Sequence, residues 1–470
     1  SNFLLLPMSK KKIVIFSLLL LLNHCSFDDK TGFWSGSKEE INKLSELDKQ
    51  NKKILDVYKI YISDKIYSKE VTLKKKLILP NAKKNSQWEM LGLNHQNYLS
   101  NISLPSIDNI FLKKNIGKKR LSTFKKKSVL LFYNNSIIFA DKTGTVFAVD
   151  ELGKTKWKKK VYKKLYKNIQ KNLVISVYKN SIYIADDVGF VYSLNANNGE
   201  VIWIKNYGTP IKSNIKVFDG KIYLIDSDNK IICLNSKDGS KIWDVLTISS
   251  FIKRPHVLPL SFTKDGSLIA LNSSADLYKL EGKSGQIIWS ANILGSLQAD
   301  ASDFFISSNI VISDNTIFLS SGKSFLSYDL EKGNIIWETN VSTVSTPIVI
   351  GGNIFIVTEN GYFVILNKLT GEIISSKNIL KILKEKHQFT KITSFIIGSG
   401  KMYSLTSNGY IIVSSASNGT TENFKKIADS LITPPIIVNE KLFVLTDKFK
   451  GFNAYNVCTG KKTVVENIVN

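Results

Sequence analysis

Cysteine and histidine are the residue types of this chain that could bind a metal ion, attach a haem or act as nucleophiles, and there are few of them. The three cysteines form neither a CxxC nor a CxxCH motif, and no two are adjacent: Cys25, Cys233 and Cys458. The four histidines are scattered without metal-ligand spacing: His24, His95, His256 and His387. This pattern excludes zinc-finger and haem-attachment sites.

Cys25 follows a stretch that is typical of a bacterial secretion signal. Met8 is followed by lysines and then by about ten mostly apolar residues, 13–22, whereas a bilayer span needs about 20. Leu22-Asn23-His24-Cys25 resembles a lipobox, although His24 stands where Gly, Ala or Ser is usual. The resemblance implies a signal peptide over residues 1–25 and acyl chains on Cys25 that hold the protein on a membrane. The alternative is a cleaved signal with an unmodified cysteine.

The charge of the chain is strongly positive but almost entirely due to lysine. The formal net charge is +25, and only Arg120 and Arg254 are arginines among 64 basic residues. Arginine is the residue that bidentate recognition of phosphate and bases favours. We therefore attribute the lysines to AT-rich codon usage and expect no nucleic-acid partner. Residues 26–84, which are polar and lysine-rich, are expected to form a tether.

The rest of the chain is a repeat of about 44 residues. Each copy has alternating apolar runs and a turn with glycine, and the glycine recurs at Gly153, Gly199, Gly239, Gly285, Gly333, Gly371, Gly419 and Gly460. Four residues after the first five glycines lie Trp157, Trp203, Trp243, Trp289 and Trp337, whereas the last three copies have Ser375, Asn423 and Val464. The tryptophans are expected to dock each repeat onto its neighbour.

The runs within each repeat are typical of short β-strands. Residues 222–225 and 354–357 are β-branched and aromatic, with Asp, Asn and Gly around them. A four-stranded unit of this length is a propeller blade, which is marginal alone but buries both faces between two neighbours. The sequence therefore predicts an all-β fold in which residues 85–470 form an eight-bladed β-propeller of four-stranded antiparallel blades.

The repeats resemble the tryptophan-docking motif of the pyrroloquinoline-quinone-like propellers, and within them the BamB-type outer-membrane assembly lipoproteins in their alphaproteobacterial form. Residues 77–101 resemble the entry segment of that family. Residues 107–117 resemble its strand before the first full repeat, which helps the N- and C-terminal segments to close the ring. The resemblance covers the signal and the chain from about residue 50 onward.

This resemblance implies a non-enzymatic scaffold without cofactor, metal or catalytic residues, lipid-anchored on the periplasmic face of the outer membrane. It implies binding to the POTRA repeats of BamA and to other barrel-assembly components, as a monomer within a complex. Loops on one face make the contact in that family, and the insertion 291–309 lies in a comparable place. The partner-binding residues are then expected to include Leu297, Asp300, Phe304 and Phe305, although the two phenylalanines also suit the core of an inner strand.

Two other functions remain open at this point. A quinone-dependent dehydrogenase would use the same wheel, but it needs a calcium ion with oxygen ligands, a carboxylate base and typically an adjacent cysteine pair. The chain has no adjacent cysteines and no haem motif. A propeller that binds another envelope partner is the other alternative. The lysine clusters at 113–127 and 154–171 could face anionic lipid or an acidic partner, or form a solvated rim.

Overall fold

A computed structural model describes the chain over residues 67–105, 109–115, 130–141, 143–162, 166, 171–248, 257–293, 306–387, 389–428, 430–431, 434–448 and 451–458. The predicted signal peptide, Cys25 and most of the predicted tether lie outside these residues. The regular structure of the described part is almost entirely β-strand, and none of its helices is long and apolar enough to cross a membrane.

Seven sheets have four antiparallel strands, and in each of them the strand order follows the chain. The first three comprise β2 (Leu131–Tyr133), β3 (Ser136–Ala140), β4 (Thr145–Val149) and β5 (Thr155–Lys160); β6 (Leu173–Tyr178), β7 (Ser181–Asp186), β8 (Phe190–Asn195) and β9 (Val201–Asn206); and β10 (Lys216–Phe218), β11 (Lys221–Ile225), β12 (Lys230–Asn235) and β13 (Lys241–Leu246).

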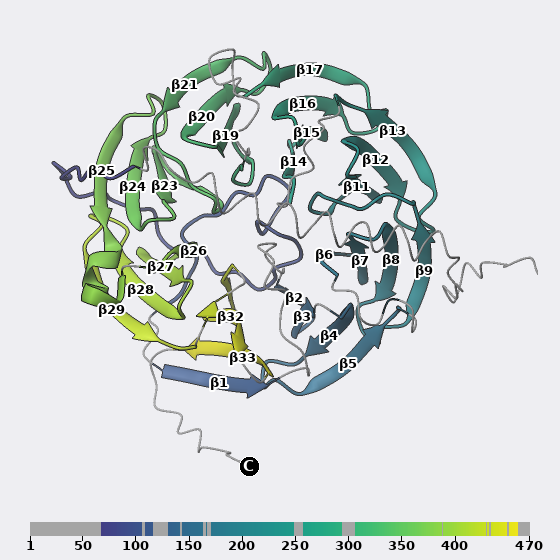
Figure 1. Cartoon of the computed structure of the whole chain (residues 1–470), viewed down its shortest axis with the longest axis horizontal. Helices are drawn as coiled ribbons and strands as arrows, with labels where there is room; N and C mark the ends of the chain where they lie inside the picture. Colours follow the sequence, from purple (N-terminus) through teal and green to yellow (C-terminus); the bar gives the residue numbers. More distant parts are fainter. Residues whose placement is uncertain are drawn as a thin grey trace, which may run out of the picture.

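The next four sheets comprise β14 (Leu260–Phe262), β15 (Ser267–Leu271), β16 (Asp276–Glu281) and β17 (Ile287–Asn292); β18 (Val311–Ser313), β19 (Thr316–Ser321), β20 (Ser324–Asp329) and β21 (Ile335–Thr339); β22 (Ile348–Ile350), β23 (Asn353–Val357), β24 (Tyr362–Asn367) and β25 (Ile373–Asn378); and β26 (Ile392–Gly398), β27 (Lys401–Thr406), β28 (Tyr410–Ser415) and β29 (Thr421–Lys426). A 3₁₀-helical segment, η2 (Ile379–His387), joins β25 to β26. Figure 1 shows the sheets around a common centre, with the first strand of each inside and the fourth outside.

The burial of each strand follows from this stacking. All five residues of β15 are buried, because neighbouring sheets cover both of its faces. The outermost strand β17 alternates between exposed and half-buried residues, since only one of its faces is covered. The two runs expected to be strands, 222–225 and 354–357, lie in β11 and β23. The fold is therefore an all-β propeller of stacked antiparallel sheets.

The last sheet has more strands than expected, so the prediction of four-stranded blades is wrong for it. It has five strands in the order β1 (Asn109–Asn115), β33 (Gly451–Cys458), β32 (Lys441–Lys448) and β30 (Ser430–Leu431), with β31 (Ile436–Val438) also on β32. Pro434 and Pro435 separate β30 from β31, and prolines interrupt a strand because they lack the N–H that a ladder needs. The antiparallel pair of β1 and β33 brings segments from both ends of the repeat region into one sheet.

Neighbouring sheets are joined by contacts between a tryptophan and a glycine. The indole N–H of Trp157, on β5, donates a hydrogen bond to the carbonyl of Ala196 in the next sheet, with N and O 3.0 Å apart. Gly199 lies under the ring: a Cβ there would be 2.5 Å from an indole carbon, and its φ is +72°. Only glycine fits on both counts. The same two contacts recur for Trp203 with Gly239, Trp243 with Gly285, Trp289 with Gly333 and Trp337 with Gly371.

The contact changes where tryptophan is missing. Ser375 occupies the corresponding position on β25, and the glycine of the next sheet, Gly419, is approached instead by the ring of Phe363. A Cβ on Gly419 would be 3.3 Å from that ring, a much looser approach than those at the tryptophans. Gly460 and Val464 lie outside the described residues.

The predicted entry segment crosses the centre of the ring. Residues 85–104 form hydrogen bonds with residues in or adjoining the innermost strands β2, β6, β10, β14, β18, β26 and β31. Figure 1 shows this part of the chain, in purple, winding through the middle of the wheel. Residues 67–84, expected to belong to the tether, lie against the sheets: Val71 pairs with Ser376 on β25, and the Leu77 N–H donates to the carbonyl of Ser417.

Candidate partner-binding face

One face of the ring carries the long connections between sheets, and we call it the loop face. It contains the turns 226–229 and 272–275 together with the described ends of two connections, 247–259 and 293–310. The Thr247 N–H donates to the carbonyl of Asn229, and the Ile293 N–H donates to the carbonyl of Ala275. Both connections therefore leave their outer strands directly beside the turns of the loop face.

A buried hydrogen-bonded frame holds the start of the first connection. The carbonyl of Ile248 accepts hydrogen bonds from Asn229 Nδ2 at 2.9 Å, Asn272 Nδ2 at 3.3 Å and Ser274 Oγ at 3.2 Å. Asn229 Oδ1 in turn accepts from the N–H of Ser273. Both asparagine side chains are buried, so their amide groups are held by the two turns and fix the position of Ile248.

Two apolar side chains are exposed where this frame ends. Leu246, the last residue of β13, is 68% exposed and Ile248 is 66% exposed. Large aliphatic side chains that are exposed on a fixed backbone are typical of protein contact sites. Covering them removes apolar area from water, and little backbone entropy is lost on binding. The loop face is therefore the strongest candidate for a protein contact among the residues that the structure describes.

The partner-binding residues expected from the sequence belong to the second connection of this face. Leu297, Asp300, Phe304 and Phe305 lie outside the described residues. The described residues on either side place both ends of the connection: Ile293 bonds the turn 272–275, and the carbonyl of Ile306 accepts from the N–H of Gly322 in the next sheet. The described residues that flank the expected ones in the sequence, Ile293 and Ile306, thus both lie on the loop face. Cys25, the expected lipidation site, also lies outside the described residues.

The centre of the ring contains a buried lysine that sequence reasoning missed. Lys216 Nζ, on β10, donates to the carbonyls of Leu91 and Asn94, at 2.9 and 2.8 Å, and to Oδ1 of Asn97 at 2.6 Å. Burial lowers the pKa of Lys216 to about 7, because the charged form loses its hydration. The acceptors come from a segment some 120 positions earlier in the chain, so no local pattern could have indicated this cage.

A second buried polar cluster lies between the first two sheets. Asp186 accepts a hydrogen bond from the hydroxyl of Tyr162 and, through Oδ1, from the N–H groups of Val188, Gly189 and Phe190. Burial raises the pKa of Asp186 to about 6. Asp226 accepts two of these three backbone bonds at the equivalent turn of the next sheet, so the carboxylate at this position stabilises a turn of the repeat. Among the described residues, no group of three or more His, Cys, Asp or Glu side chains could hold a metal ion.

Solved structures with the same architecture include a BamB protein, an alcohol dehydrogenase and a designed protein. BamB from Moraxella catarrhalis is 13% identical over 73% of this chain and 99% of its own, with a TM-score of 0.58. Quinohemoprotein alcohol dehydrogenase from Comamonas testosteroni is 12% identical over 82% of each chain, with a TM-score of 0.61. The computationally designed Ika8 protein is 12% identical over 72% of this chain and 99% of its own, with a TM-score of 0.53.

These likenesses show the fold alone, because the sequences are so distant. No curated protein matches the chain by sequence. The model of one protein family, described as outer membrane protein assembly factor BamB, matches residues 141–377, just over half of the chain, including all five tryptophans of the repeat. The chain therefore belongs to the BamB family.

Proposed function

We propose that this protein is a non-enzymatic scaffold of the outer-membrane β-barrel assembly machinery, and that its loop face binds the POTRA repeats of BamA. Membership of the BamB family supports an assembly role. The observation that carries the proposal is the pair of exposed side chains, Leu246 and Ile248, on a frame that two buried asparagines fix. A few residues that become fully buried at the centre of an interface supply most of its affinity.

The wheel proposed for this role is a closed ring of eight blades formed by residues 85–470. The seven four-stranded sheets and the five-stranded last sheet would be those blades, and the pairing of β1 with β33 would close the ring. The second connection of the loop face would add Leu297, Asp300, Phe304 and Phe305 to the contact. The protein would act as a monomer within the complex.

The location proposed for this scaffold is the periplasmic face of the outer membrane. Residues 1–25 would direct secretion, acyl chains on Cys25 would anchor the protein, and residues 26–66 would connect the anchor to the first described residues. Two or more acyl chains give stable anchoring because each buried CH₂ contributes about 0.8 kcal/mol.

The test is the affinity of the full chain for the purified periplasmic region of BamA. The double variant Leu246→Asp and Ile248→Asp should lose at least about 25-fold in affinity, since truncating even one central anchor typically costs about 2 kcal/mol. The matched control is Ile288→Asp with Ile336→Asp, on β17 and β21, where both isoleucines are about half exposed. The control should bind like the unaltered chain. Equal losses in both variants, or no binding by the unaltered chain, would contradict the proposal.

A quinone-dependent dehydrogenase is the second candidate, which the likeness to quinohemoprotein alcohol dehydrogenase favours. Pyrroloquinoline quinone with Ca²⁺ would then raise the melting temperature of the full chain and support reduction of a dye by alcohols. We expect neither effect. If BamA fails to bind but another envelope protein requires Leu246 and Ile248, the protein is a propeller scaffold with a different partner.

A further inference from the structure

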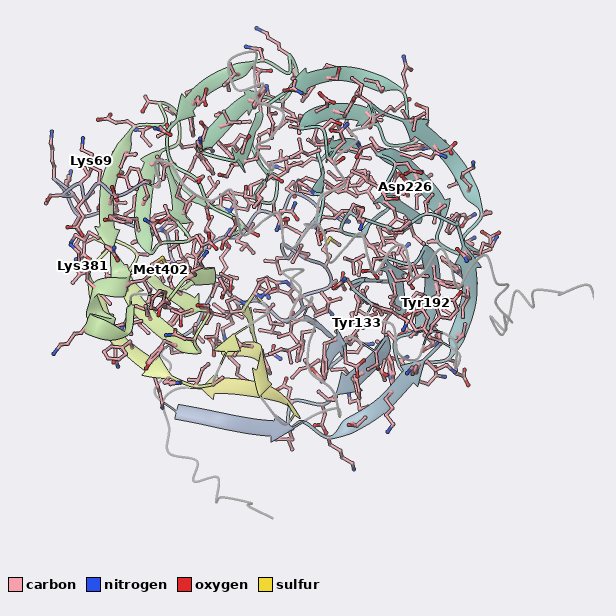
Figure 2. All side chains as sticks on the ribbon, viewed as in Figure 1. Lys69, Tyr133, Tyr192, Asp226, Lys381 and Met402 are labelled. Carbon is pink, nitrogen blue, oxygen red and sulfur yellow. The ribbon has the colours of Figure 1, made fainter. Side chains whose placement is uncertain are left out.

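Exposed lysines gather on one edge of the wheel, which we call the basic edge. It consists of Lys69, Lys74, Lys75 and Lys76 in the segment 67–84, Lys381 in η2, and Lys425 and Lys426 on β29, and all seven are exposed. Figure 2 shows the side chains of Lys69 and Lys381 on the same outer side of the ring, beside β25 and η2. The basic edge therefore combines residues that are far apart in the sequence.

The acidic residues of this edge do not neutralise it. Glu70 pairs with Lys381 at 2.9 Å, and Glu422 pairs with Lys401 at 2.8 Å. The lysines at positions 69, 74, 75, 76 and 425 form no ion pair within the described part of the chain. Their charges are therefore free to attract an anionic surface.

The outermost strands of the third, fourth and fifth sheets have a different character. On β13 Lys241 pairs with Asp244 at 3.2 Å, β17 has no charged residue, and β21 has only Glu338. The outermost strands of these three sheets are thus near neutral, whereas β29 carries two lysines and β5, in another sector of the wheel, carries Lys156, Lys158, Lys159 and Lys160.

The two most exposed large hydrophobic side chains of the described residues lie in the same sector as the lysines. Ile78, which is 92% exposed, follows Lys76 by two positions, and Phe389, which is 93% exposed, lies between η2 and β26. Apolar side chains among lysines are the pattern of surfaces that bind at the boundary of a membrane, where the lysines approach the headgroups and the apolar groups enter the acyl region.

The segment that supplies most of these lysines is fixed to the wheel. The carbonyl of Tyr67 accepts a hydrogen bond from Asn360 Nδ2 at 2.8 Å, and the carbonyl of Ser68 accepts from the hydroxyl of Tyr362 at 3.0 Å. Val71 pairs with Ser376 on the outermost strand of that sheet. The lysines are therefore held as part of the folded surface.

We propose that the basic edge, with Ile78 and Phe389, docks the wheel onto a bilayer surface that carries anionic phospholipid headgroups. Lysine suits such a surface because its compact charge needs no fixed geometry, whereas recognition of nucleic acid favours the planar fork of arginine. The lipid at this edge would orient the wheel and leave the part of the loop face around Leu246 and Ile248 free. The inference goes beyond the proposed role with BamA and stands without it.

The first test places a fluorescent probe on the edge. In the full chain with Cys25→Ser and Cys458→Ser, an environment-sensitive dye is attached at Ile78→Cys or, as a control, at Leu246→Cys, which is 68% exposed on the opposite side. Vesicles with phosphatidylglycerol should shift the emission at position 78, neutral phosphatidylcholine vesicles should not, and 0.5 M salt should reverse the shift. No shift at position 78, or an equal shift at 246, would overturn the proposal. A response to polyglutamate without a response to vesicles would also overturn it and indicate an acidic protein instead.

The second test removes the charge. Lys69→Glu, Lys75→Glu and Lys425→Glu together should weaken partition onto anionic vesicles by at least about 100-fold, since each lysine at an anionic surface contributes about fivefold. The matched control, Lys237→Glu, Lys283→Glu and Lys332→Glu, changes the net charge equally on exposed turns of other sheets and should lose less than threefold. Equal losses would show adhesion through overall charge and refute a specific edge. Both variants should keep their affinity for BamA, so a failure here is separate from a failure of the proposed function.

Discussion

The substitution Gly199→Ala tests how much the contact between a glycine and the tryptophan of the preceding sheet stabilises the wheel. An alanine Cβ at this position would lie 2.5 Å from the ring of Trp157, closer than any normal contact, and the atoms it meets belong to a buried indole. The indole must then move, which strains or breaks its hydrogen bond to the carbonyl of Ala196. We expect the free energy of unfolding to fall by more than the strain of a left-handed backbone conformation alone would cause.

The control for this substitution is Gly220→Ala, because the two glycines share a backbone conformation but not a neighbour. The φ of Gly220 is +71° and that of Gly199 is +72°, while a Cβ on Gly220 would meet only Ser236 Oγ, at 3.8 Å. A left-handed conformation costs alanine about 1–2 kcal/mol at either site. Overpacking against Trp157 adds about 1–3 kcal/mol, and the lost hydrogen bond about 1 kcal/mol. The free energy of unfolding should thus fall by about 2–4 kcal/mol more for Gly199→Ala.

The assay is urea unfolding followed by circular dichroism for both variants and for a double-mutant cycle. Trp157→Phe removes part of the ring that the new Cβ meets, so its combination with Gly199→Ala should cost less than the sum of the two single changes. Equal costs for Gly199→Ala and Gly220→Ala, or additive costs in the cycle, would refute the view that the indole restricts this position to glycine.

Two further substitutions extend this reasoning. Gly419→Ala should cost only the backbone strain of about 1–2 kcal/mol, because the nearest ring atom of Phe363 is 3.3 Å away; a cost equal to that of Gly199→Ala in the same urea assay would contradict this. Lys216→Met should flatten the pH dependence of stability between pH 7 and 10. The pKa of Lys216 is near 7 when folded and about 10.4 when unfolded, so the unfolded chain binds more protons in this window and stability rises with pH. Urea midpoints at pH 7, 8.5 and 10 measure this rise, and an unchanged slope in the variant would exclude Lys216 as its source.

The tryptophan and glycine positions could be predicted because the glycine recurs in all eight repeats and the tryptophan in the first five. Trp157 contacts Gly199 in the next repeat, and each later tryptophan contacts the next glycine in the same way. Consecutive repeats of the sequence therefore form consecutive sheets of the wheel. The strands at 222–225 and 354–357 could be predicted for the same reason. What failed was the strand count of the last sheet, where Pro434 and Pro435 divide the inner strand. Its outer strand, β1, lies within residues 107–117, which the family resemblance indicated and the repeat did not. The divided inner strand and the added outer strand each occur only once in the chain, so the repeat pattern does not predict them.

Contacts between distant segments could not be predicted from the sequence. Lys216 begins the short strand β10, and nothing nearby indicates that it is buried. Its acceptors lie in the entry segment, which was identified by family resemblance and whose path through the centre depends on hydrogen bonds to strands more than 100 residues away. The expected partner-binding residues, from Leu297 to Phe305, lie outside the described residues and remain a prediction.

The position of the tryptophan–glycine contacts also shows how one architecture can occur both in BamB and in an alcohol dehydrogenase. Each contact joins an outer strand to a turn of the next sheet, so it sets the spacing of the blades without taking part in the centre or the loop face. Function can then change independently at those two places. In this chain the centre is crossed by residues 85–104 and hydrogen-bonded to Lys216, whereas Leu246 and Ile248 project from the loop face. Substitutions in the motif should therefore lower stability, and only substitutions on the loop face should lower affinity for a partner at unchanged stability.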